Sequence, residues 1–412
     1  MNMHKNILVT LAAVSVSCIF SVVLCGRTFH DSETGKGKPI RLIDLEKKRV
    51  LESAKACLEQ EPTPITSFYS RRSAGGRHDY FSEGDYWWPD PKNPKGPYVR
   101  RDGETNPNNF IEHRHALMQL GIQAAELASA YRITGDEAYA RHAVKHLRTW
   151  FVNPNTIMNP HLQYAQAIQG VCTGRGTGII DTIHLVEVVK AIQALESSKA
   201  LTPVDLEALR KWFRAYLQWV TTSQYGIDER DSKNNHSSAW VFQVAAFAQM
   251  ALDSGQLEFC RKRFKEVILP KFMNGSGGFP DELGRTKPYG YSIFHLDICA
   301  GIAQLLSTPA DNLWTFVSPD GHGMGKGLAF LFPFLRDKSS WPFKHDVMYW
   351  DEWPVRQPSL LFGGLALNKP EYVALWMELK PEPTSEEGLR NWPIRQPLLW
   401  LKPEQALTVQ PK

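Results

Sequence analysis

Four polar residues between positions 234 and 291 have the side chains needed to abstract a proton next to a carboxylate. They are an amide and an imidazole, Asn235 and His236, followed by a guanidinium, Arg285, and a phenol, Tyr291. Breaking an acidic polysaccharide by β-elimination removes a weakly acidic proton alpha to a carboxylate, so that carboxylate must be neutralised and the enolate-like intermediate stabilised. Amide, imidazole and guanidinium donors can do this. We therefore interpret these residues as a candidate catalytic group.

The phenol of Tyr291 is the candidate for proton transfer. Tyrosine normally titrates at about pH 10, and we expect Arg285, as a neighbouring cation, to favour the phenolate and bring its pKa nearer to the working range. One phenol can act as both base and acid only where the C5 proton and the leaving O4 lie on the same face of the sugar. β-Mannuronate and β-glucuronate meet that condition. In guluronate the two groups are opposed, and His236 would then be the natural base.

An aromatic loop at residues 78–91 contains Tyr86, Trp87 and Trp88 among charged side chains. Aromatic faces stack on sugar rings while adjacent polar groups bind hydroxyls, so this composition is typical of a carbohydrate cleft. The alternative is that the two tryptophans only pin the loop to the body of the protein. We assign all three residues to substrate binding.

A glycine-rich segment at 170–178 lacks the Gly-Lys-Ser/Thr ending and the preceding strand of a nucleotide site. Its Arg175 is suited instead to a carboxylate ligand at a helix N-terminus. His161 and Tyr164, just upstream, are expected to line the same wall. Tyr289 competes with Tyr291 for the proton-transfer role, and we assign it to substrate binding.

Two other kinds of site fit the sequence less well. His113 and His115 invite a metal, but no third ligand is apparent, and residues two apart on a helix point to different faces. We therefore predict no metal and no other cofactor. A glycosidase would need two carboxylates flanking the scissile bond. Asp346, Asp351 and Glu352 lie beside basic residues, which favours ordinary surface ion pairs.

Helices must position these residues, because apolar side chains recur at helical spacing through most of the chain. The pattern predicts helices over 43–58, 110–134, 137–151, 179–195, 203–222, 237–253, 257–269, 292–306 and 325–335. Gly135 and Asp136 are expected to turn the chain and to cap the following helix. Successive helix pairs without alternating strand patterns predict an all-α fold, an (α/α) barrel or toroid, in a single domain over 27–412.

Two irregular features accompany the helices. The long Pro-, Gly- and Asp-rich stretch at 62–107 is of a kind that usually carries function. The sequence at 353–360 recurs in similar form at 392–399, which indicates two similar helix-entry turns near the C-terminus.

Composition and the N-terminus limit the partners and the location. The chain has 47 Lys plus Arg against 43 Asp plus Glu, a formal charge of +4 without dense basic runs, so we expect no nucleic-acid partner. Residues 1–26 resemble a signal peptide, with Lys5 before an apolar run. We expect export to the periplasm or cell envelope, or secretion, with no membrane span after signal removal. Cys18 and Cys25 could each accept a lipid anchor.

The sequence resembles the alginate lyase superfamily of helical-toroid polysaccharide lyases over most of residues 75–365. Six segments carry the resemblance: 79–91, 159–161, 174–178, 234–237, 282–285 and 291–292. Within that group it is most similar to polysaccharide lyase family 38, whose members cleave alginate or glucuronan. The resemblance implies an (α/α) barrel without a metal, in which Asn235 and His236 neutralise the carboxylate, Arg285 assists, and Tyr291 acts as base and acid.

We therefore expect a lyase acting on mannuronate-containing alginate, with an acidic polysaccharide as its partner. A glucuronan lyase is the alternative within the class. A non-catalytic protein that binds acidic glycans, or a glycoside hydrolase on the same toroid, is the alternative from another class.

Overall fold

The computed structural model describes residues 39–407. The predicted signal peptide at 1–26, with Cys18 and Cys25, lies outside the described residues. None of the helices in the described part has both the length and the apolar character needed to cross a bilayer.

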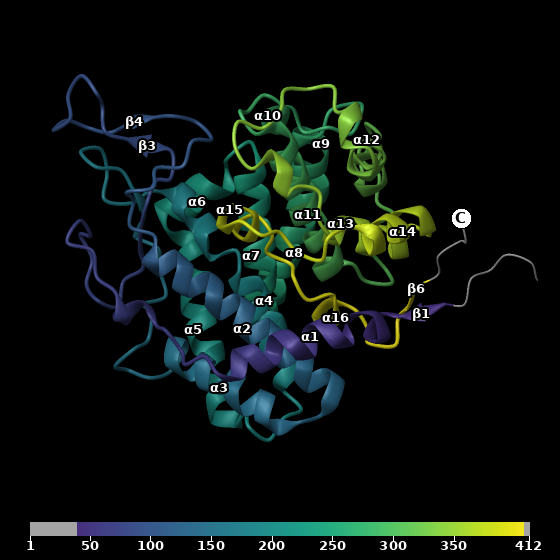
Figure 1. Ribbon diagram of the computed structural model, residues 1–412, viewed down its shortest axis with the longest axis horizontal. Helices are drawn as coiled ribbons and strands as arrows, with labels where there is room; N and C mark the ends of the chain where they lie inside the picture. The colour runs from purple at the N-terminus through teal and green to yellow at the C-terminus, as the bar shows by residue number, and fades with distance from the viewer. Residues whose placement is uncertain (1–38, 408–412) are drawn as a thin grey trace, which may run out of the picture. The chain divides into compact units, whose positions relative to one another are not determined.

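Helices make up most of the described chain (Figure 1). Helix α2 packs against α1, α3 and α4, while α7 packs against α4, α5, α8 and α11. The long helices are α1 (Leu42–Leu58), α2 (Glu112–Thr134), α3 (Glu137–Phe151), α4 (Leu185–Leu195), α5 (Pro203–Thr222), α7 (Asn235–Ala251), α8 (Ser254–Arg263), α11 (Pro288–Leu306) and α12 (Met324–Arg336). The shorter ones are α6 (Gln224–Arg230), α9 (Leu269–Phe272), α10 (Pro280–Leu283), α13 (Pro358–Ala366), α14 (Pro370–Glu378), α15 (Glu386–Arg390) and α16 (Pro397–Trp400).

Local sequence signals set several helix ends as expected. Gly135 adopts φ 70°, a left-handed conformation that suits glycine, and ends α2. The Asp136 carboxylate then accepts a hydrogen bond from the Ala138 N–H and caps α3. Helix α5 begins with Pro203 after a capping box made by Thr202 and Asp205. The predicted α2–α3 hairpin is confirmed.

Strands are few and short in the described residues. β1 (Ile40–Arg41) pairs antiparallel with β6 (Ala406–Leu407), with Ile40 opposite Leu407. β2 (Phe81–Glu83) runs parallel to β5 (Tyr164–Ala167), and β3 (Trp87–Trp88) pairs antiparallel with β4 (Val99–Arg100). The irregular stretch at 62–107 is thus tied to the helical body by strand pairing, and it carries the aromatic residues of the predicted loop.

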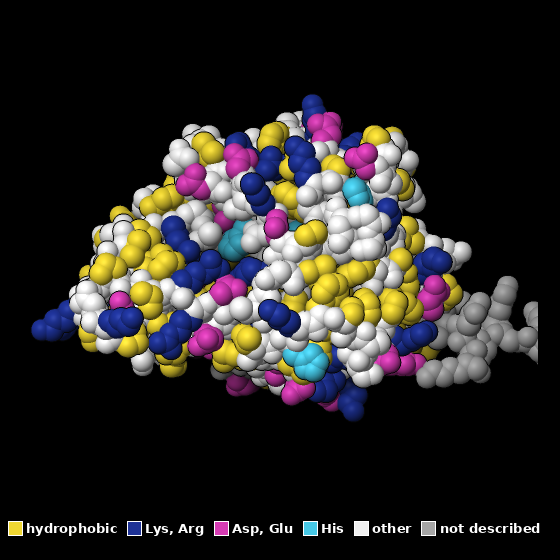
Figure 2. Space-filling view, turned by 90° about the horizontal axis from the view of Figure 1, so that it is seen from above, with side chains coloured by type: hydrophobic (Ala, Val, Ile, Leu, Met, Phe, Trp, Pro, Cys, Tyr) yellow, Lys and Arg dark blue, Asp and Glu magenta, His cyan; other side chains and the backbone are white. Residues whose placement is uncertain are grey.

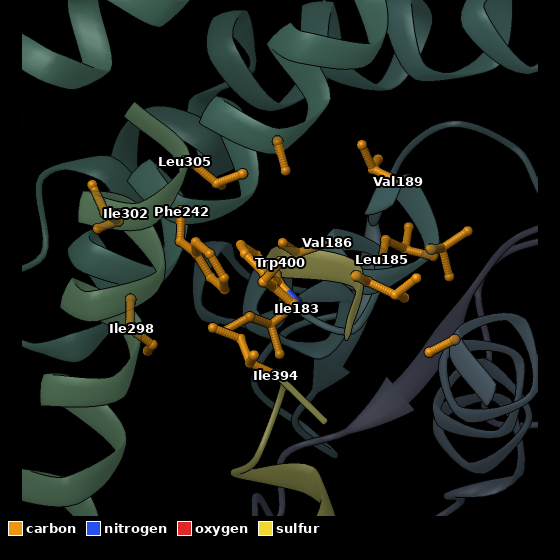
Figure 3. Close-up of a cluster of buried hydrophobic side chains, with 14 of the residues drawn as sticks. Ile183, Leu185, Val186, Val189, Phe242, Ile298, Ile302, Leu305, Ile394 and Trp400 are labelled. Carbon is orange, nitrogen blue, oxygen red and sulfur yellow. The ribbon is translucent and has the colours of Figure 1, made fainter. Parts of the chain in front are cut away.

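The two similar C-terminal turns do enter helices, α13 and α16, and a buried carboxylate lies at each. Asp297 accepts a hydrogen bond from the Ser359 N–H, and Glu187 accepts from the N–H groups of Arg395 and Gln396. Trp400 of α16 stacks on Phe242 of α7, with ring centres 6.0 Å apart. Figure 3 shows these two rings within a core that also receives side chains from α4 and α11.

Two expectations were wrong. The helix predicted over 257–269 is interrupted by a π-helical turn, η3 (Phe264–Ile268), just before Pro270, whose nitrogen has no hydrogen to donate. Asp346 is not a surface ion-pair residue: it is buried and accepts hydrogen bonds from the N–H groups of Tyr289 and Gly290 at the start of α11.

Four short segments of the described chain are 3₁₀ helices. They are η1 (Ile65–Ser67), η2 (Gly176–Thr182), η4 (Lys338–Ser340) and η5 (Trp350–Glu352).

Candidate active site

A cleft of about 470 Å³ brings the four candidate catalytic residues together. Asn235 and His236 come from the start of α7, Tyr291 from the start of α11, and Arg285 from the loop between α10 and α11. Lysine and arginine side chains gather around a hollow on the face drawn in Figure 2. The other residues lining the cleft are Asp85, Tyr86, Trp87, Arg100, Gln166, Arg175, Thr177, Ile180, Ser232, Lys233, Asn234, Asp281, Phe294, Arg390 and Asn391.

The Tyr291 hydroxyl is paired with a second phenol. Its oxygen lies 2.5 Å from the hydroxyl oxygen of Tyr86, and either group could be the donor. The Arg285 guanidinium lies 4.4 Å from the centre of the Tyr291 ring, and the Lys287 ammonium lies 5.1 Å from it. Two phenols and two cations therefore lie close together around the Tyr291 side chain.

Burial controls the proton affinity of this pair. Removal from water raises the pKa of Tyr291 well above its ordinary value, and the charges of Lys287 and Arg285 oppose this rise without outweighing it. Burial likewise raises the pKa of Tyr86. Arg285 lowers the Tyr291 pKa as expected, but burial outweighs it and the net shift is upward, because the sequence does not show how deeply this phenol is buried.

His236 is held by a buried carboxylate. Its Nδ1 lies 2.7 Å from Oε1 of Glu229, a residue of α6 with no exposed surface. The carboxylate accepts a hydrogen bond from the Nδ1–H group, which leaves Nε2 as the ring nitrogen available to a ligand. Asn234 caps α7 by accepting from the His236 N–H, and the Asn235 N–H donates to Glu282. The start of α7 is thus fixed, while the side chains of Asn235 and His236 line the cleft.

Arg285 is clamped by the irregular stretch. Its Nε and Nη2 donate to the two carboxylate oxygens of Asp102 over 3.0 and 2.9 Å, and the Thr286 hydroxyl donates to the Asp102 carbonyl. Burial alone would lower the pKa of Arg285, but the hydrogen bonds to Asp102 and the negative charges around the guanidinium together outweigh it and raise that pKa. The guanidinium is therefore permanently charged and held in one orientation, as planar bidentate pairing requires.

Arg175 and Trp87 form another part of the cleft wall. The Arg175 Nη2 donates to the Gln166 side chain over 2.7 Å, and its guanidinium lies 5.9 Å from the centre of the Trp87 ring. Gly84 permits this approach, because a Cβ there would lie 2.6 Å from Cδ1 of Trp87 and 3.3 Å from Nη2 of Arg175.

Four residues assigned to substrate binding lie outside the cleft lining. The Trp88 indole donates to the Glu104 carbonyl and packs under Arg101, so its contacts lie within the irregular stretch itself. His161 pairs with Asp79, and the Tyr164 ring packs against Gly75. The fourth, Tyr289, is buried and donates to the Phe334 carbonyl.

Sequence reasoning missed several groups that touch the site. Glu229 lies seven positions before His236, and only the fold of α6 brings it to the imidazole. Asp102 had no signal beyond its place in the irregular stretch. Arg390 and Asn391 line the cleft from a part of the chain beyond residue 365, where the sequence resemblance is weaker. Among residues 39–407, no three His, Cys, Asp or Glu side chains are grouped as metal ligands would be.

Comparisons with known proteins agree with this fold. A family model described as alginate lyase matches residues 65–341. The crystal structure of an alginate lyase from Bacteroides ovatus is 31% identical, with a TM-score of 0.75 over 87% of this chain and 93% of that chain. No curated protein sequence matches.

More distant structures share the fold alone. Alginate lyase A1-III from Sphingomonas species A1 is 14% identical, with a TM-score of 0.51 over 88% of this chain and 95% of that one. An A1-III variant complexed with tetrasaccharide is 13% identical, with a TM-score of 0.53 over 89% and 96%. The expected helical toroid is confirmed, and the family model together with the 31% identical structure shows a polysaccharide lyase. The chain belongs to the alginate lyase family; its place in polysaccharide lyase family 38 stays a prediction.

Proposed function

We propose that this protein cleaves mannuronate-containing alginate by β-elimination, with Tyr291 as base and then acid. The observation that carries the proposal is the meeting of Asn235, His236, Arg285 and Tyr291 in one cleft. The 31% identical structure, an alginate lyase by its description, supports the choice of substrate. Residues 1–26 support action outside the cytoplasm, in the periplasm or cell envelope, where Cys18 or Cys25 could carry a lipid.

Neutralisation of the substrate carboxylate is the first requirement. The Asn235 amide and the clamped Arg285 guanidinium line the space in which a uronate would lie, together with Nε2 of His236, which donates when the ring is the imidazolium paired with Glu229. These groups offer donors and positive charge where the enolate-like intermediate gains negative charge, and in a partly dry cleft they need little reorganisation. The acidity of the C5 proton rises as a result.

Proton transfer falls to Tyr291. As a base it must be a phenolate, and two cations favour that form: the Lys287 ammonium lies 5.1 Å and the Arg285 guanidinium 4.4 Å from the ring centre of Tyr291. The phenolate takes the C5 proton of a mannuronate and the electron pair forms the C4–C5 double bond. As O4 leaves, the phenol returns a proton to it, so one residue serves both steps.

A second candidate is favoured by the Glu229–His236 pair. Because the buried carboxylate holds Nδ1, the other ring nitrogen has a lone pair that can accept a proton. On guluronate, where the C5 proton and O4 lie on opposite faces, His236 would act as the base and Tyr291 as the acid. The same cleft would then cleave both uronates.

The test incubates the purified protein separately with polymannuronate, polyguluronate and glucuronan and follows the ultraviolet absorbance of a 4,5-unsaturated uronate. We expect this absorbance with polymannuronate. Products without the double bond would indicate a hydrolase, and binding without products would indicate a glycan-binding protein; either result contradicts the proposal. If His236 is the base for guluronate, His236→Gln loses more activity on polyguluronate than on polymannuronate.

A further inference from the structure

A buried lysine lies beside the proposed acid–base residue without lining the cleft. Lys287 is 3% exposed, and its Nζ donates to Oε1 of Glu387 over 2.6 Å. Three tyrosine rings surround the ammonium: their centres lie 5.1 Å away for Tyr291, 5.2 Å for Tyr86 and 5.3 Å for Tyr349. A buried charge costs much free energy unless it is paired, and for Lys287 the Glu387 carboxylate supplies that pairing.

The partner of Lys287 comes from a distant segment that is firmly held. Glu387 belongs to α15, beyond the residues 65–341 that match the family model. The Glu352 carboxylate accepts from the Thr384 and Ser385 N–H groups just before this helix. At its far end Arg390 pairs with Asp85 over 2.6 Å. The chain therefore fixes Glu387 against Lys287 from both sides.

We propose that Lys287 is a positioning residue for catalysis: its charge stabilises the negative charge that forms on the Tyr291 oxygen, and Glu387 holds the ammonium in place. The inference rests on the proposed function, because it assigns a role in the same proton transfer. Lys287 lies over the ring of Tyr291 and does not line the cleft, so it should affect turnover rather than binding.

Lys287 and Glu387 have opposite effects on the pKa of Tyr291. Burial raises the pKa of Tyr291; Lys287 and Arg285 lower it, whereas Glu387 raises it further. Burial lowers the pKa of Lys287, but Glu387 and the charge of Tyr291 together outweigh burial and raise it, so the lysine is charged. The titratable and charged groups facing this cluster are Tyr86, Asp346, Tyr349 and Arg390, besides those just named.

The experiment measures the pH dependence of kcat on polymannuronate for wild type, Lys287→Met and Glu387→Gln. Removing the cation should move the acid limb of the profile to higher pH by about 1 unit, which is about tenfold in rate below the limb. Removing the anion should move the limb to lower pH. Lys338→Met is the matched control, because Lys338 lies over the ring of Tyr289, which does not line the cleft.

Opposite shifts of the two limbs, with KM within about threefold of wild type and Lys338→Met unchanged, support the inference. If Lys287 only holds α15 in place, both variants lose activity without a shift of the limb, and the inference is overturned. A loss confined to KM also overturns it. Near-ultraviolet circular dichroism identifies a variant that does not fold, and the other variant then decides by the direction of its own shift. An inactive wild type contradicts the proposed function, whereas an active wild type with an unshifted Lys287→Met contradicts this inference alone.

Discussion

Asp102→Asn removes the carboxylate that clamps Arg285 over Tyr291. Burial alone would raise the pKa of Asp102, but the hydrogen bonds and charge of Arg285, with smaller contributions from Arg100 and Thr286, lower it from 3.8 to about 2. That difference of about 1.8 units corresponds to roughly 2.4 kcal/mol at about 1.36 kcal/mol per unit. The side chains of Arg285 and Asp102 are 19% and 23% exposed, and the pair lies at the cleft wall. Solvent screening reduces the value, so we expect about 1 kcal/mol.

The assay is kcat/KM on polymannuronate at neutral pH. If the whole of the roughly 1 kcal/mol that orients Arg285 is lost from transition-state stabilisation, kcat/KM falls about fivefold. The pKa of Asp102 is lowered in the folded protein, so the clamp is intact above about pH 4 and weakens as pH falls toward 2; neutral pH therefore tests it at full strength. Asp44→Asn is the matched control, because Asp44 of α1 forms an exposed bidentate pair with Arg41 that this substitution breaks. An Asp102→Asn variant as active as Asp44→Asn would refute the reasoning.

Three further predictions concern binding and stability. Trp87→Ala should raise KM about tenfold through lost stacking, whereas Trp88→Ala, at a residue outside the cleft lining, should change KM less in the same kinetic assay. Burial raises the pKa of Glu187 from 4.5 to about 7, so its contribution to stability is present below pH 4.5 and is lost as pH rises through 7. Urea unfolding at pH 5 and pH 8 should show a smaller difference for Glu187→Gln than for wild type. Gly178→Ala should lower the melting temperature, because its Cβ would lie 2.5 Å from the Cβ of Ala165.

Much of the helical fold could be predicted from the sequence. Apolar spacing placed α5 at its observed bounds, and Gly135 with Asp136 marked the turn between α2 and α3. Such features depend on residues close together in the chain. The π-helical turn before Pro270 and the short helices α6, α10 and α15 were missed, because a few residues carry no complete apolar period.

The site was predictable where the chemistry dictates residue types. Asn235, His236, Arg285 and Tyr291 could be singled out because their side chains suit one reaction, and the structure places all four in one cleft. The residues that hold them could not be predicted, because Glu229 reaches His236 and Asp102 reaches Arg285 only through tertiary packing. Composition also could not distinguish the two tryptophans, of which Trp87 lines the cleft and Trp88 does not, nor reveal that burial sets the direction of the Tyr291 pKa shift.

The most direct test of the central claim is the turnover of Tyr291→Phe on polymannuronate, measured beside its affinity for the same polymer. The substitution keeps the ring between Arg285 and Lys287 and removes only the hydroxyl that exchanges the proton. The account predicts that formation of the unsaturated product falls by a factor on the order of 10³ or more while polymer binding stays near that of wild type. A variant that still forms the product at the wild-type rate would contradict the account.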